Sequence, residues 1–147
     1  MDPSNPAPVN GLLRTATLHH LGIAVKSIEK AIPVYQDLFG YKLFSGPFDD
    51  PIQRVSVCFL QRPGPSEIVV ELISPLGSDT PINRILTKRE GPYHTCYQVG
   101  NLDEVIEQLR AKNCSLLSEP VPAVAFNERR IAWLVTPTQQ LVELLDE

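Results

Sequence analysis

The sequence predicts an α+β fold made of two tandem βαβββ modules, and two observations support this prediction. First, the chain repeats itself: "HHLGIAVKSIEKAI" at 19–32 aligns with "YHTCYQVGNLDEVI" at 93–106, and "VVELI" at 69–73 aligns with "LVELL" at 141–145. Second, each repeat has the same order of apolar segments and turn residues. Similarity at a fixed offset indicates two copies of one supersecondary unit.

The first module is predicted over residues 17–74. An apolar strand is followed by a helix that begins after Ser27, a good N-cap, and ends at Gly40. Three apolar segments, "YKLFS", "RVSVCFL" and "EIVVELI", come next, with breaks at "GPFDDP" and "RPGPS". The apolar side chains that recur at helical spacing are Ile28, Ala31, Ile32, Tyr35 and Phe39.

The second module is predicted over residues 92–147. Its helix begins after Asn101, which forms a capping-box pattern with Glu104. The strands that follow are "SLLSE", "RRIAWLV" and "QLVELL", with breaks at "PVPAVAFN" and "TPTQ". The predicted buried stripe of the helix is Leu102, Val105, Ile106 and Leu109.

Two further segments complete the chain. Residues 75–91 are predicted to be a linker with room for one short helix over 82–86. Residues 1–16 are rich in proline, asparagine and serine and are predicted to be a disordered tail. The sequence therefore predicts one domain of two modules over residues 17–147, preceded by an N-terminal tail.

Composition limits the classes of partner. The net charge is −4 and no strongly basic cluster is present, so we expect no nucleic-acid partner. No apolar run approaches the roughly 20 residues needed to span a bilayer, so we expect no membrane partner. Three cysteines, an odd number in apolar surroundings, predict reduced thiols and a cytoplasmic location. A small-molecule substrate is the predicted partner.

The repeat places a histidine and a glutamate at matching positions of the two modules. His20 aligns with His94, and Glu71 aligns with Glu143. A lone strand histidine is most often a hydrogen-bonded structural side chain, and a lone strand glutamate usually points to water. Two such pairs at matching positions are less easily explained in this way.

If the two glutamates are buried, their charge must be compensated. Strand side chains alternate, so Glu71 shares a face with Val69 and Ile73 while the residues between them cover the other face. Burying an ionised carboxylate is costly unless a cation, a proton or a metal compensates it. Neither module has a lysine or arginine at the equivalent point. A pseudo-twofold between the modules would unite two histidines and two glutamates as a site for Zn²⁺, Co²⁺, Ni²⁺, Mn²⁺ or Fe²⁺.

Neighbouring polar residues are expected to lie outside this ligand set. Adjacent strand residues point to opposite faces, so only one of His19 and His20 can reach the site. The repeat selects His20, because Tyr93 aligns with His19, and predicts that His19 lies at the surface or an interface. We expect Cys96 to be a small buried thiol. The adjacent Arg129 and Arg130 could hold a substrate carboxylate, but solvation of both is the default expectation.

Three segments carry a resemblance to a known family. "LHHLGIAVKSIEKAIPVYQDLFGY", "VELISPLGSDTPINRIL" and "GPYHTCYQVGNLDEVIEQLRAKN" resemble the vicinal oxygen chelate superfamily, and within it the methylmalonyl-CoA epimerases. The resemblance implies an incomplete barrel of two modules around one divalent metal ion, an acyl-CoA or other acyl thioester as substrate, and a homodimer. It also implies the metal ligands, which are His20, Glu71, His94 and Glu143.

Two loops depart from the epimerase pattern. A glycine-rich turn before the penultimate strand is replaced within 120–130 by "PAVAFNERR". An "HPK" with paired glycines before the last strand is replaced at 136–140 by "TPTQQ". These changes bear on recognition of an acyl-CoA more than on metal binding.

The function expected from these features is that of a metal-dependent isomerase or epimerase. Such an enzyme removes and returns a proton next to a carbonyl. We expect Glu143 to act as ligand and base, and Glu71 as ligand and second base. Two alternatives remain open. One is a glyoxalase I-type lyase that acts on a thiol adduct with the same four ligands. The other is a small-molecule binding protein of the bleomycin-resistance kind, which needs no metal.

Overall fold

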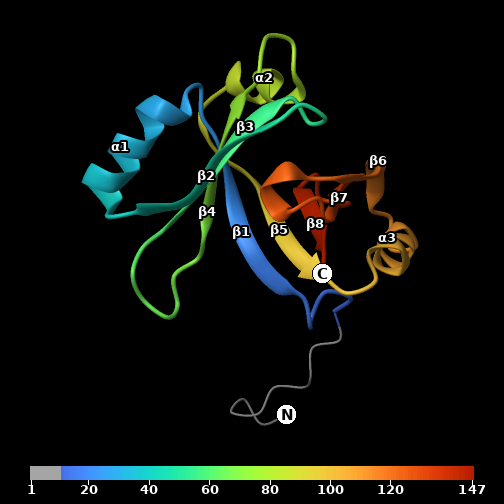
Figure 1. The fold of residues 1–147 in the computed structure, drawn as a ribbon. Helices are drawn as coiled ribbons and strands as arrows, with labels where there is room; N and C mark the ends of the chain where they lie inside the picture. The colour runs from blue at the N-terminus through green and yellow to red at the C-terminus, as the bar shows by residue number, and fades with distance from the viewer. Residues whose placement is uncertain (1–10) are drawn as a thin grey trace.

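The computed structural model describes residues 11–147, in which eight strands form one curled sheet in the order β2-β3-β4-β1-β5-β8-β7-β6 (Figure 1). Both predicted modules are present, so the α+β fold of two βαβββ units is confirmed. The elements of the first module are β1 (Thr17–Ala24), α1 (Ile28–Phe39), β2 (Lys42–Asp50), β3 (Val55–Gln61) and β4 (Val70–Pro75). A linker helix, α2 (Pro81–Leu86), precedes β5 (Gly91–Val99), α3 (Leu102–Arg110), β6 (Ser115–Pro122), the 3₁₀ helix η1 (Val124–Phe126), β7 (Arg130–Val135) and β8 (Leu141–Asp146).

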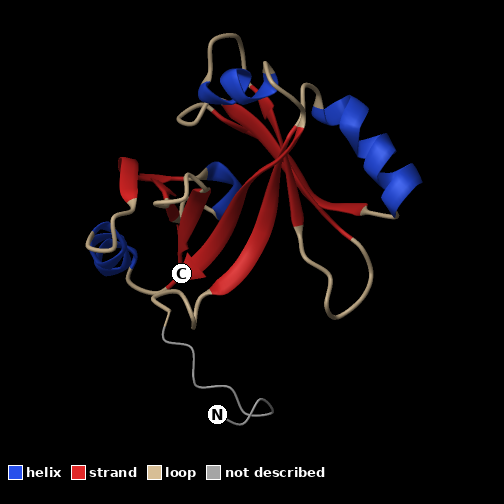
Figure 2. Cartoon of the chain, turned by 180° about the vertical axis from the view of Figure 1, so that it is seen from behind, coloured by secondary structure: helices blue, strands red, loops and turns tan. Residues whose placement is uncertain are grey.

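The two modules meet at the centre of the sheet. β1 and β5 pair antiparallel there, and each is flanked on its other side by the parallel last strand of its own module, β4 or β8. Figure 1 shows this central pair in blue and yellow, and Figure 2 shows it from behind. The arrangement has the pseudo-twofold symmetry that the repeat predicts.

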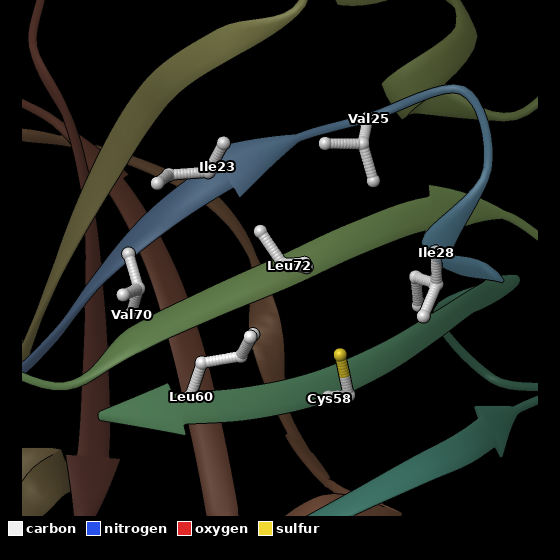
Figure 3. Packing of buried hydrophobic residues seen from close by; sticks show 7 residues of the cluster. All are labelled: Ile23, Val25, Ile28, Cys58, Leu60, Val70 and Leu72. Carbon is white, nitrogen blue, oxygen red and sulfur yellow. The ribbon is translucent and has the colours of Figure 1, made fainter. Parts of the chain in front are cut away.

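One long helix covers the outer face of each module. In the first module, alternate residues of β1, β3 and β4 lie on the face of the sheet that packs against α1, and Figure 3 shows their side chains together with Ile28 at the start of that helix. Burying one such aliphatic side chain contributes about 1.5–3 kcal/mol. The fully packed residues of this cluster are Ile23, Val25, Ile28, Cys58, Leu60, Val70 and Leu72. In the second module α3 covers an equivalent cluster of Val99, Leu102, Ile106, Ala132, Leu134 and Leu144.

Strand alternation turns the remaining side chains inward. Val70 and Leu72 pack under α1, so Glu71 and Ile73 face the interior of the curled sheet, as predicted from "VVELI". In β8, Leu144 packs under α3 and Glu143 faces the interior. The alternation of side chains along a strand therefore places both glutamates on the inner face of the sheet.

The helix boundaries agree with the capping chemistry. Ser27 Oγ accepts a hydrogen bond from the backbone N–H of Lys30, and Gly40 ends α1 in the left-handed conformation at φ 73°. Asn101 Oδ1 accepts from the backbone N–H of Glu104 at 3.4 Å. Of the apolar residues at helical spacing in α1, Ile28, Ala31, Ile32 and Tyr35 pack against the sheet, whereas Phe39 at the end of the helix is 50% exposed.

Two predicted breaks are wrong. "GPFDDP" lies largely within β2, and the start of "PVPAVAFN" extends β6 to Pro122. Both are edge strands, where a proline such as Pro47 or Pro120 removes no hydrogen bond from a second neighbour. Register shifts in both pairs absorb the irregular backbone.

The remaining segments have simple descriptions. Residues 1–10 of the predicted tail lie outside the described residues, and their disorder stays a prediction. Residues 11–16 form turns, and Leu13 and Ala16 pack against the cluster under α3. Cys58, Cys96 and Cys114 are free thiols. Within residues 11–147, no helix has the length and apolar character that crossing a bilayer requires.

Candidate metal centre

Four side chains from the two modules converge inside the curled sheet. At most 5% of the surface of each side chain is exposed. Nε2 of His20 lies 3.1 Å from Nε2 of His94 and 3.2 Å from Oε1 of Glu143. The other separations join His20 Nε2 to Glu71 Oε1 (3.4 Å), His94 Nε2 to Glu143 Oε1 (3.6 Å) and His94 Nε2 to Glu71 Oε1 (3.7 Å). The structure thus brings together all four residues selected by the repeat.

Sheet register explains the convergence. Glu71 pairs with Gly22 across β4 and β1, and Glu143 pairs with Cys96 across β8 and β5. Across the central pair of strands, His20 lies opposite Cys96 and His94 lies opposite Gly22. Each module therefore places its histidine two residues along from the strand position that faces its glutamate. Because the modules are related by the pseudo-twofold, both pairs meet at the axis.

Gly22 provides the space that the ring of His94 occupies. A Cβ built on Gly22 would lie 1.9 Å from Cε1 and 2.1 Å from Nδ1 of His94. Real side-chain atoms do not approach so closely, so any other residue at position 22 would displace the ring. The site therefore depends on a glycine as well as on its four polar members.

A β-bulge lies immediately before each histidine. The register shifts between Leu18 and His20 in β1, and between Gly22 and Ile23 opposite β5, where Tyr93 is the extra residue. His19 and Tyr93, the two extra residues, pack edge-on against the next histidine ring, with centroids 5.1 Å and 4.5 Å away respectively.

The bulge corrects the prediction for His19. Strict alternation would turn His19 away from His20, but the extra residue breaks alternation, and Nδ1 of His19 lies 2.9 Å from Nδ1 of His20. His19 is half-buried between Phe59 and Phe126. Burial, together with the neighbouring His20, lowers the pKa of His19 to about 4, so this imidazole is neutral at physiological pH.

The electrostatics of the four-residue cluster favour a cation at its centre. Burial lowers the pKa of His20, but the carboxylates of Glu71 and Glu143 outweigh this effect and raise it to about 10. Burial raises the pKa of Glu143, but the adjacent imidazoles of His20 and His94 outweigh this effect and hold it far below its usual range. A proton on His20 thus neutralises part of the carboxylate charge, and a divalent ion could do so more completely.

The donor set fits such an ion. Four tetrahedral ligand atoms, each about 2.0–2.2 Å from a zinc-like ion, lie roughly 3.3–3.6 Å apart, close to the separations between the imidazole and carboxylate atoms. Oε1 of Glu143 is buried and has no well-aligned hydrogen-bond partner among the described residues, although it faces both imidazoles. Ligand atoms that point at a common ion, and not at one another, have such short separations without well-aligned hydrogen bonds.

Cys96 is adjacent to this cluster and has a different role. It is fully buried opposite His20 and beside Glu143. Burial and the charge of Glu143 raise the pKa of its thiol far above the usual range. Because a thiolate is the form that binds metals, the neutral thiol agrees with the expected small buried side chain.

A largely apolar pocket of about 450 Å³ reaches the two glutamates. Its lining includes Ile73 from β4, Ile82 and Ile85 from α2, and Trp133 from β7. Tyr93 also lines this pocket, and burial together with the charges of Glu71 and Glu143 raises the pKa of its phenol well above the usual value. The phenol therefore stays neutral and can donate a hydrogen bond.

Contacts between the modules close one wall of the pocket. The buried carboxylate of Asp50 accepts hydrogen bonds from the backbone N–H groups of Ile52, Gln53 and Val124. The indole N–H of Trp133 donates to Oε1 of Gln53 at 3.2 Å. These bonds tie the β2–β3 turn to η1 and β7 and define the pocket shape.

The comparison with protein families agrees with this geometry. The model of the Glyoxalase/Bleomycin resistance protein/Dioxygenase superfamily matches residues 19–133. The chain belongs to this superfamily. The matched range includes three members of the cluster, and the fourth, Glu143, follows on β8.

Several relatives that the chain resembles are methylmalonyl-CoA epimerases. The mitochondrial methylmalonyl-CoA epimerase of Bos taurus is 35% identical over 104 residues, which cover 69% of this chain and 57% of that protein. The chain thus spans just over half the length of the mammalian epimerases that it matches. The solved epimerase from Mycobacterium tuberculosis is 28% identical with a TM-score of 0.75, covering 88% of this chain and 86% of that one. A hypothetical protein from Bacillus halodurans C-125 is 30% identical with a TM-score of 0.76, covering 91% and 96%.

Sequence reasoning missed several residues of this superfamily site. Gly22 aligns with Cys96 in the repeat, but only the structure shows which ring fills the space above it. Tyr93 was visible only as the residue before His94. Trp133 and Gln53 carried no signal, since their contact joins β7 to the β2–β3 turn, 80 residues away.

The arginine pair lies outside the pocket. Arg129 donates from Nε to the carbonyl of Phe126. Arg130 forms ion pairs with Asp103 and Asp146 at the surface. Neither guanidinium lines the pocket. A substrate carboxylate would therefore not meet either one there.

Proton release should accompany metal binding. For Nε2 of His20 to bind an ion, the proton held up to a pKa of about 10 must leave. Below that pH the proton competes with the metal, and affinity should fall by about tenfold for each unit of pH decrease. Calorimetric titration of the metal-free protein in buffers with different ionisation enthalpies measures the released protons. A binding heat that does not depend on the buffer would contradict this expectation.

Proposed function

We propose that the chain is a metal-dependent epimerase that removes and returns a proton at the carbon next to the carbonyl of an acyl thioester. The convergence of two buried carboxylates with two imidazoles, at one end of an apolar pocket, carries the proposal. The relatives named methylmalonyl-CoA epimerase support this reaction class. Because the chain spans only part of the mammalian epimerases, the activity and its substrate are inferred.

The proposal assigns a role to each polar group at the end of the pocket. Glu143 removes the proton, and Glu71, which reaches the cluster from the other module, returns one. The neutral phenol of Tyr93 donates a hydrogen bond to a substrate oxygen that lies near the carboxylates. General acid–base catalysis of this type contributes typically about 10²–10⁴-fold in rate.

The four-residue cluster would hold the metal. A divalent ion bound by His20, Glu71, His94 and Glu143 would supply Lewis acidity that stabilises negative charge on the substrate oxygen. The candidate ions remain Zn²⁺, Co²⁺, Ni²⁺, Mn²⁺ and Fe²⁺, since imidazole and carboxylate ligands suit all of them.

The pocket would exclude water from the reacting carbon. Ile73, Ile82, Ile85 and Trp133 line it, and charge–dipole interactions strengthen where water is absent. The apolar part of the acyl thioester would occupy this space. Its carbonyl would lie at the end where Glu71 and Glu143 meet.

Isotope exchange tests the reaction. With methylmalonyl-CoA in deuterium oxide, we expect the protein to incorporate deuterium at the α-carbon, followed by mass spectrometry or proton NMR. A hemithioacetal assayed in parallel tests the glyoxalase I-type alternative. If the protein converts the hemithioacetal but does not exchange the α-proton of methylmalonyl-CoA, it is a glyoxalase I-type lyase. If it binds either compound without reaction, a small-molecule binding protein is favoured.

Narrowing the pocket should reduce turnover. Ala125 lines the pocket, so Ala125→Leu is expected to lower kcat/KM for the thioester by about 10-fold or more, since added methylenes obstruct the substrate. Ala111→Leu, at the exposed end of α3, is the matched control. Steady-state kinetics with both variants, and with thermal unfolding as a check of the fold, measure the effect. Equal kcat/KM values would mean that substrate binds elsewhere.

Assembly and location complete the proposal. We expect a homodimer, as the superfamily resemblance implies. The exposed apolar side chains of Leu38 and Phe44, 70% and 57% exposed, are candidate contacts. Light scattering after gel filtration should give twice the mass of the chain, and a monomer mass would contradict the expectation. Cytoplasmic location stays a prediction.

A further inference from the structure

The two histidines of the cluster differ in what lies behind them. In both modules the bulged residue lies edge-on against the next histidine ring. In the first module that residue is His19, whose Nδ1 lies 2.9 Å from Nδ1 of His20. In the second module it is Tyr93, and Nδ1 of His94 has no hydrogen-bond partner among the described residues. The pseudo-symmetry is therefore broken behind the metal-facing atoms.

When His20 binds a metal, only one arrangement of protons allows a hydrogen bond between Nδ1 of His19 and Nδ1 of His20. Nε2 of His20 points into the cluster, so as a ligand it must carry its electron pair there and keep its proton on Nδ1. The Nδ1 of His19 must then be the unprotonated acceptor, with its own proton on Nε2. Metal-binding histidines usually donate their second N–H to a carboxylate, a carbonyl or water. Here a neutral imidazole lies in that place.

The ring of His19 is held in position from two sides. The rings of Phe59 and Phe126 pack edge-on against it, with centroids 6.2 Å and 5.3 Å away. The bulge fixes the backbone, and these two rings restrict the side chain. The acceptor is therefore preorganised.

We propose that His19 is a positioning residue of the metal centre: its Nδ1 accepts a hydrogen bond from Nδ1–H of His20 and so directs Nε2 of His20 at the ion. This inference rests on the proposed metal site and adds a residue that contacts neither ion nor substrate. His20 and His94 are thus unequal ligands, because within residues 11–147 His20 has a partner on Nδ1 that sets its tautomer and ring orientation and His94 has none.

Two variants of similar size separate hydrogen bonding from packing. His19→Asn keeps an acceptor oxygen near the position of Nδ1, whereas His19→Leu removes the acceptor. Tyr93→Phe is the symmetry-related control, since the phenol makes no hydrogen bond to His94. The full chain is stripped of metal, and Co²⁺ affinity is measured by competition with a chromophoric chelator. Thermal unfolding of the metal-free proteins reports the fold.

We expect His19→Leu to weaken Co²⁺ binding by about 10–100-fold, as for other partners of metal-binding histidines. His19→Asn should restore most of the affinity, and Tyr93→Phe should leave it unchanged. In the Zn²⁺-loaded protein with ¹⁵N-labelled histidine, the Nδ1 proton of His20 should give a slowly exchanging NMR signal. This signal should persist in His19→Asn and disappear in His19→Leu.

Three outcomes would overturn the inference. The first is a His19→Leu protein that is folded and binds Co²⁺ as tightly as the wild type. The second is a wild-type spectrum without the protected Nδ1 proton of His20, which decides the matter even if His19→Leu does not fold. The third is a wild-type chain that binds no divalent ion, a result that would also remove the proposed metal centre. If the wild type and His19→Leu bind Co²⁺ equally tightly, the inference about His19 is wrong but the proposed function is unaffected.

Discussion

Glu143→Gln is expected to abolish exchange of the α-proton of an acyl thioester. The glutamine amide has nearly the same shape as the carboxylate and keeps one oxygen toward the cluster, but it cannot accept the proton. Loss of a general base lowers the rate by about 10²–10⁴-fold. Glu143 is 3% exposed, faces both imidazoles and lines the end of the pocket, which is where a base for the α-proton must lie.

The measurement is the initial rate of deuterium incorporation from deuterium oxide, normalised to the metal content of each sample. This normalisation is needed because Glu143 is also a proposed ligand. Glu107→Gln, on the exposed face of α3 with a side chain that is 71% exposed, is the matched control and should exchange like the wild type. Normal exchange by a metal-loaded Glu143→Gln protein would place the base elsewhere, with Glu71 the next candidate.

Gly22→Ala is expected to eliminate tight metal binding. The added methyl group would lie 1.9 Å from Cε1 of His94, so the imidazole must move out of the cluster or the strands must separate. Either change takes away one of four ligands. Overpacking of this kind also costs about 1–3 kcal/mol in free energy of unfolding.

Co²⁺ titration and chemical denaturation of Gly22→Ala measure these two effects separately. Gly100→Ala is the matched control, because a Cβ there would lie 3.4 Å from the flexible carboxylate of Glu147. The control should bind Co²⁺ and unfold like the wild type. Wild-type affinity in Gly22→Ala would show that His94 is not a ligand or that its ring is placed differently.

The fold and the four-residue cluster were predictable because they follow from symmetry. A repeat with nearly constant offset forces equivalent strands to pair in equivalent registers, so His20 and His94 had to meet if the modules paired through β1 and β5. Alternation then placed Glu71 and Glu143 on the inner face. Patterns of period two and spacing along the chain were sufficient for these conclusions.

The local irregularities could not be predicted in the same way. The bulge at His19 breaks the alternation of side chains that the prediction for His19 assumed. The bulge depends on how β1 pairs with β5 and not on the residue type at position 19, so the local sequence does not indicate it. The course of β2 through Gly46 and Pro47 depends on its place at the sheet edge. The pocket wall depends on the contact of Gln53 with Trp133, which no local pattern encodes.

The metal content of the purified protein tests the central claim most directly, namely that His20, Glu71, His94 and Glu143 form one divalent metal site. The chain should be prepared without chelator and analysed by inductively coupled plasma mass spectrometry, together with a Glu71→Ala/Glu143→Ala double variant. We predict one divalent ion per chain in the wild type and loss of that ion in the double variant. A wild-type chain that holds no divalent ion after supplementation with each candidate metal, or a double variant that retains it, would contradict the claim.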